Sequence, residues 1–175
     1  MDPQLLSSPW VRVPPVLLTL VVLQLTLVAG MPLFRTTADL LLLAAVAAAL
    51  VAGPERGAVL GLVFGFAYDL VLQTPFGLSA LTSCLVAYAV GRVRVGMLQP
   101  VWWVAPAATV VASAAGIGLY AALATVLGEV DLLERRLLVT MAVVGVLNGV
   151  WGLVVRPVVR WSLAGDAAAT TAVVR

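Results

Sequence analysis

One acidic side chain lies inside an apolar stretch of this sequence, "GAVLGLVFGFAYDLVLQTPFG", which runs from Gly57 to Gly77. Glycine recurs at every fourth position, at Gly57, Gly61 and Gly65, and the next step of this count is Asp69. Glycines spaced in this way share one face of a helix and let another helix pack closely against it. An aspartate inside a membrane costs roughly 2.5–3.5 kcal/mol on insertion scales, so Asp69 is expected to face a bundle interior.

Three interpretations of Asp69 stay open at this point. The first is a protonated packing residue that is hydrogen-bonded to a neighbouring helix. The second is a role in partner binding or in a conformational change, and the third is translocation of protons or ions. We expect its charge to be neutralised by a proton or by an arginine.

Two further elements belong to the candidate site. The segment "QTPFG" carries Pro75 and Gly77, which predict a turn between two helices. Asn148 lies in "GVLNGVWG", a second small-residue face, and is expected to hydrogen-bond between helices. The candidate residues for helix packing or partner binding are therefore Gly57, Gly61, Gly65, Asp69, Pro75, Gly77 and Asn148.

The composition contains few of the residue types that catalysis or metal binding requires. Histidine is absent and Cys84 is the only cysteine, which excludes zinc sites of the Cys/His type and a histidine-based triad. No phosphate-binding loop and no basic patch interleaved with aromatic residues is present. We therefore predict no enzymatic activity, no catalytic residue, no metal, no cofactor and no nucleic-acid partner.

The composition indicates the class of protein that must position these residues. Hydrophobic residues make up 63% of the 175 residues and charged residues 10%, and the mean hydropathy is +1.14. A soluble domain is about 25% charged. The chain is therefore predicted to be an all-α, polytopic bundle embedded in the lipid bilayer.

Charge-free intervals predict about six transmembrane helices. A single bundle domain is expected over residues 1–163, followed by a disordered cytoplasmic tail over residues 164–175. The expected spans are Val13–Phe34, Leu40–Gly53, two helices between Arg56 and Arg92 that "QTPFG" separates, about Trp102–Leu127, and Leu137–Val155. The turn from Gly53 to Gly57 is expected to be a tight inner connection.

The arginines predict the orientation of this bundle. All ten basic residues are arginine, and six spans place both termini on one side. With that side cytoplasmic, seven arginines lie inside and three outside, as the positive-inside rule requires. The inner set is Arg12, Arg56, Arg92, Arg94, Arg156, Arg160 and Arg175, and the outer set is Arg35, Arg135 and Arg136.

The order of features between Ala38 and Arg92 is that of one known family. An acidic residue opens a leucine-rich span, a short charged turn follows, and a glycine-rich span ends near an aspartate. A "PxGL" turn then leads into a helix closed by tyrosine and Gly-Arg. These features are Asp39, Pro54 to Gly57, Asp69, Pro75 to Leu78, Tyr88 and Gly91-Arg92. In this third of its length, the chain resembles the rod shape-determining protein MreD family.

The resemblance implies a non-enzymatic scaffold of the bacterial cell-elongation machinery, the elongasome, in the inner membrane. Such a protein binds an MreC-like bitopic partner, works alongside the MreB filament, and is linked indirectly to RodA and a class B penicillin-binding protein. It helps to maintain cell shape and to regulate peptidoglycan synthesis. The family fold is also similar to the substrate-binding subunits of energy-coupling-factor transporters, so the alternative is a vitamin-binding transporter subunit.

Overall fold

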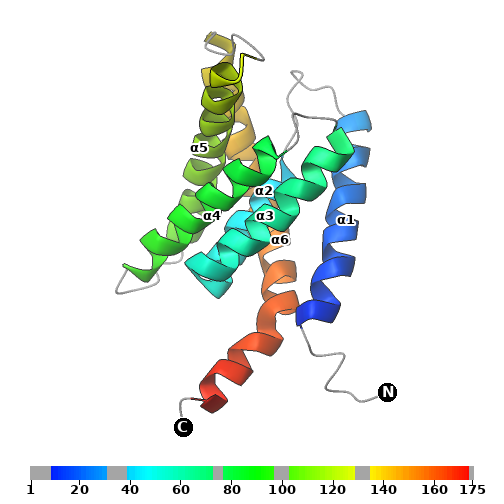
Figure 1. Cartoon of the computed structure of the whole chain (residues 1–175), viewed down its shortest axis with the longest axis vertical. Coiled ribbons are helices and arrows are strands. Elements are labelled where there is room, and N and C mark those ends of the chain that lie inside the picture. The colour runs from blue at the N-terminus through cyan, green and yellow to red at the C-terminus, as the bar shows by residue number, and fades with distance from the viewer. Residues whose placement is uncertain (1–8, 31–38, 73–76, 97–102, 129–134, 174–175) are drawn as a thin grey trace.

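The computed structural model of the chain describes residues 9–30, 39–72, 77–96, 103–128 and 135–173, and their regular structure is all helical. The helices are α1 (Pro9–Gly30), α2 (Leu40–Ala52), α3 (Pro54–Leu72), α4 (Leu78–Val95), α5 (Val104–Val126) and α6 (Arg135–Val173). They form one bundle, with α3 and α4 side by side as a hairpin and α1 and α5 toward opposite edges (Figure 1). The predicted all-α bundle of six helices is confirmed.

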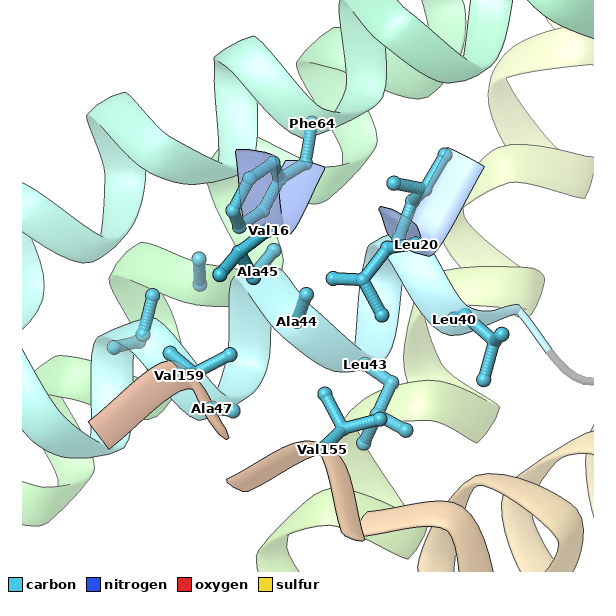
Figure 2. Packing of buried hydrophobic residues seen from close by; sticks show 14 of the residues in the cluster. Val16, Leu20, Leu40, Leu43, Ala44, Ala45, Ala47, Phe64, Val155 and Val159 are labelled. Atoms are coloured by element: carbon cyan, nitrogen blue, oxygen red, sulfur yellow. The ribbon is translucent and has the colours of Figure 1, made fainter. Parts of the chain in front are cut away.

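Helix α2 is the centre of this bundle. Its sequence "LLLLAAVAAALVA" is apolar all round, which is typical of a helix buried on every side. Every residue from Leu40 to Leu50 is buried, and α2 contacts each of the other five helices. Figure 2 shows Val16 and Leu20 of α1, Phe64 of α3, and Val155 and Val159 of α6 around it.

Local sequence signals explain where α2 begins and where α3 follows it. Asp39 caps the first turn of α2 by accepting a hydrogen bond from the Leu42 amide at 2.9 Å. Gly53 alone separates α2 from α3, and its φ of +88° is a conformation that favours glycine. Pro54 then occupies the first helical position, where no amide donor is needed. The expected five-residue turn is therefore a single residue, and the segment from Pro54 to Gly57 is the start of α3.

The outer surface of the bundle is apolar. Three helices in the described residues are long and apolar enough to cross a membrane, over Leu78–Val95, Val104–Val126 and Leu137–Leu163. Large hydrophobic side chains are exposed on the outer helices, among them Leu18, Val22, Val111, Leu138, Val146, Val150 and Leu153. A continuous apolar surface of this kind suits lipid rather than water. The chain is a membrane helix bundle.

Helix α6 is longer than the sequence predicted. The expected span ended at Val155 because the charge-free interval ends at Arg156, yet the helix runs from Arg135 to Val173. Its backbone is thus helical through residues 164–173, and the division between bundle and tail stays a prediction. The start of α1 and the end of α6 lie at the same end of the molecule (Figure 1). Near that end, the Arg12 guanidinium lies 4.9 Å from the centre of the Trp161 ring.

Candidate functional site

Two glycines of the ladder on α3 lie against the backbone of α4. A β-carbon at Gly65 would lie 2.4 Å from Ala80 Cα, and one at Gly61 would lie 2.6 Å from the Ser83 carbonyl oxygen. Carbon atoms in ordinary contact are about 3.5–4.0 Å apart, so neither position has room for any side chain. The sequence makes this close approach possible because small residues face each other on both helices.

The third glycine of the ladder contacts a different helix. A β-carbon at Gly57 would lie 2.5 Å from Ala49 Cα of α2. The ladder therefore packs α3 against α2 at its first turn and against α4 further along. The close contacts of all three glycines lie within this bundle.

Asp69 caps the N-terminus of α4 from across the hairpin. Its Oδ2 accepts hydrogen bonds from the amides of Gly77 at 3.0 Å and Ala80 at 3.3 Å. Its Oδ1 accepts one from the Ser79 amide at 3.3 Å. Gly77 precedes α4 with a φ of +93° and provides no side-chain cap of its own. These amides are donors that the first turn of any helix leaves unpaired, and they lie where the helix dipole favours a negative charge.

This geometry explains why an aspartate at position 69 is stable inside an apolar helix. The residue is buried, with 2% of its surface exposed, and the glycine ladder brings α4 close enough for the contact. We predicted neutralisation by a proton or an arginine, whereas these contacts are to backbone amides. Pro75, the other residue predicted for this turn, lies outside the described residues.

Asn148 forms a second buried polar cluster at the N-terminus of α2. Its Oδ1 accepts from the Asp39 amide at 3.1 Å, and its Nδ2 donates to the Asp39 carbonyl oxygen at 3.2 Å. Nδ2 also donates to Ser113 Oγ at 3.0 Å, which ties α5 to α6. Gln24 of α1 adds a bond from the Leu40 amide to its Oε1 at 2.9 Å. Helices α1 and α6 thus satisfy the polar end of the buried α2, and α5 holds Asn148 in place through Ser113.

A small polar cavity of about 180 Å³ lies between these two caps. The polar groups that line it are Asp39, Tyr68, Ser79, Thr82, Ser83 and Tyr120. The hydroxyl of Ser79 is buried and has no hydrogen-bond partner among the described residues. A cavity with several polar groups is suited to ordered water. The arrangement holds the N-terminal ends of α2 and α4 in place.

Comparison with known families decides the interpretation of this architecture. The family model described as rod shape-determining protein MreD matches residues 7–162, which is most of the chain. The chain belongs to the MreD family. The resemblance seen between Ala38 and Arg92 therefore extends over nearly the whole bundle. No curated protein and no solved structure matches the chain.

Membership in the MreD family establishes that the chain has a role in rod-shape determination. The chain is thus a membrane protein of the cell-shape machinery. The similarity to transporter subunits that the resemblance implied is not shown. Among the described residues there is no group of three side chains suited to hold a metal ion. The absence of catalysis, metal and cofactor stays a prediction for this MreD-family chain.

Sequence reasoning missed several positions that shape the site. A β-carbon at Gly91 of α4 would lie 2.4 Å from Pro54 Cα, so this glycine packs against the turn between α2 and α3. Gln24 and Ser113 were not among the predicted site residues, although Gln24 accepts from the Leu40 amide and Ser113 accepts from Asn148. The importance of Gly91 could have been predicted, because Gly91-Arg92 was one of the family features. The hydrogen bonds of Gln24 and Ser113 could not, because their partners are distant along the chain.

Proposed function

We propose that this chain is a non-enzymatic membrane scaffold of the bacterial cell-elongation machinery, which binds an MreC-like single-span partner through membrane helices. The observation that carries the proposal is the match to the MreD family over residues 7–162. Through this partner the scaffold is linked indirectly to RodA and a class B penicillin-binding protein, and so helps to regulate peptidoglycan synthesis and cell wall biogenesis.

The architecture supports contact through helices. The connections between the helices are short, at residue 53 and over residues 31–39, 73–77, 96–103 and 127–134, so none is long enough to be a domain. A stable interface buries about 1,600 Å² in total, which requires the helix faces. Helix α6 offers one such face, with Val146, Val150 and Leu153 exposed at helical spacing.

Co-purification tests this interface. The full chain is expected to co-purify from membranes with an MreC-like protein that has been cut down to its transmembrane segment and flanking residues. A matched partner carrying an unrelated transmembrane segment is the control and should not be retained. If binding requires the soluble domain of the partner, the model of helix contact fails.

We also propose a multi-pass arrangement in the inner membrane with both termini in the cytoplasm. The support is the distribution of seven inner and three outer arginines. Reporter fusions after Arg56 and after Arg160 are expected to give a cytoplasmic signal, and a fusion after Asp131 an external one. A cytoplasmic signal at Asp131 would overturn this orientation.

No specific observation favours the alternative of a vitamin-binding transporter subunit. The polar cavity at the helix caps has about 180 Å³, which is below the ~300–1,000 Å³ of typical ligand pockets. The larger groove between α4 and α5 is lined by apolar residues and glycine apart from Arg94 and Arg156, so it lacks the several polar groups that fix the orientation of such a ligand. Proton or ion translocation through Asp69 also has no specific support, because its carboxylate is engaged at the start of α4.

A further inference from the structure

An apolar groove runs between α4 and α5 and is separate from the two polar caps. Successive turns of both helices form its walls, including Val86 and Val90 of α4 and Ala108 and Ala112 of α5, and Leu50 of α2 adds to its lining. Figure 1 shows α4 running obliquely to α5. The groove has a cavity volume of about 990 Å³, which lies at the upper end of the ~300–1,000 Å³ typical of ligand pockets.

Two arginines give the groove a strong positive charge. Arg94 in the last turn of α4 and Arg156 of α6 both contribute to its lining, and its described lining contains no aspartate or glutamate. Arg156 is repelled electrostatically by Arg94 and by Arg160. An anion placed between Arg94 and Arg156 would turn this repulsion into two attractive contacts.

The position of these arginines along their helices matches a lipid headgroup. Arg156 follows Arg135 by 21 residues in α6, a distance of about 32 Å at 1.5 Å per residue. The hydrocarbon core of a bilayer is about 30 Å thick, so the two residues reach opposite interfaces. Val104, at the start of α5, also lines the groove, and the positive end of that helix dipole favours an anion.

We propose that this groove binds an anionic phospholipid, with the lipid phosphate between Arg94 and Arg156 and an acyl chain along the apolar walls. A guanidinium is well suited to phosphate because it offers paired donors in a fixed geometry. An apolar helix in the groove would leave both arginines without a counter-charge, and free phosphate would leave the apolar walls uncovered. This proposal goes beyond the scaffold function and does not depend on the partner protein.

Native mass spectrometry of the purified full chain tests the proposal. The chain in neutral detergent is mixed with equal amounts of phosphatidylglycerol, which is anionic, and phosphatidylcholine, which has no net charge. The chain is expected to retain phosphatidylglycerol with a preference of about 30-fold, as two arginines that each contribute about 1 kcal/mol at a membrane surface would give. Inorganic phosphate at matched concentration should not displace the lipid.

Two pairs of variants locate the site. Arg94→Gln with Arg156→Gln is expected to abolish the preference, whereas Arg92→Gln, an exposed charge outside the groove lining, should leave it unchanged. Ala108→Trp should block lipid uptake, whereas Ala107→Trp, on the exposed side of the same turn, should not.

Circular dichroism and size-exclusion chromatography check that each variant folds. If Ala108→Trp does not fold, the double variant of Arg94 and Arg156 is sufficient to test the proposal. Equal retention of both lipids would overturn the proposal. Loss of the preference in Arg92→Gln, or a second copy of the chain occupying the groove in place of lipid, would also overturn it.

Discussion

Gly65→Ala is expected to destabilise the hairpin of α3 and α4 by about 3 kcal/mol, at the upper end of the usual cost of overpacking. The new methyl group would lie 2.4 Å from Ala80 Cα and 2.5 Å from the Ser79 carbonyl oxygen. Both are backbone atoms, so no flexible side chain can move aside. The two helices must separate, which also removes the α4 amides from Asp69.

Gly152→Ala is the matched control for this change. A β-carbon at Gly152 would have its nearest contacts at 3.6 Å, to Leu43 Cδ1 and Thr109 Cγ2, which is ordinary packing. Alanine is also the better helix former, by up to about 1 kcal/mol. Reversible unfolding in mixed detergent micelles should therefore show Gly152→Ala at or above the wild-type stability. Equal stability of Gly65→Ala and Gly152→Ala would show that α3 and α4 do not pack as closely as described.

Asp69→Leu is expected to cost about 3 kcal/mol or more, because it removes the acceptor of three amides at the start of α4. A buried donor left without a partner costs about 1–3 kcal/mol. Asp69→Asn should be intermediate, at about 1–2 kcal/mol, since its single oxygen can still serve the amides of Gly77 and Ala80. Its NH₂ group would then face the Ser79 amide, donor against donor.

The same unfolding measurement separates the explanations of Asp69. If Asp69 were a protonated packing residue, asparagine would be nearly silent, and if it were an ion pair with arginine, asparagine would be as damaging as leucine. Ser79→Ala is the control, because it keeps the capped amide and removes a hydroxyl without a partner in the described residues. Ser79→Ala should leave the free energy of unfolding unchanged. An asparagine variant as stable as wild type would contradict the capping role.

The sequence was sufficient for the class of fold and for most of the helix boundaries. Long charge-free intervals gave the number of helices, and Asp39 followed by four leucines marked the start of α2 correctly. The sixth span was expected to end at Val155 because the charge-free interval ends at Arg156. In the structure the helix continues past this residue to Val173.

The partners of the buried polar groups could not be predicted in the same way. Asp69 binds amides 8–11 residues further along the chain, and a pattern of side chains contains no signal for backbone donors. Asn148 and Asp39 are 109 residues apart, and only the packing of α6 against α2 brings them together. Hydropathy predicts that such polar groups face the interior of the bundle, but it does not predict their hydrogen-bond partners.

Rod-shape determination by this chain, through the scaffold role proposed above, requires the close packing of α3 against α4. The most direct measurement is cell morphology in its source organism, with the native copy depleted and each variant supplied at matched membrane levels. Wild type, Gly152→Ala and Ser79→Ala are expected to restore rods, whereas Gly65→Ala and Asp69→Leu should leave cells without rod shape. Rods of normal width with both Gly65→Ala and Asp69→Leu would contradict the account.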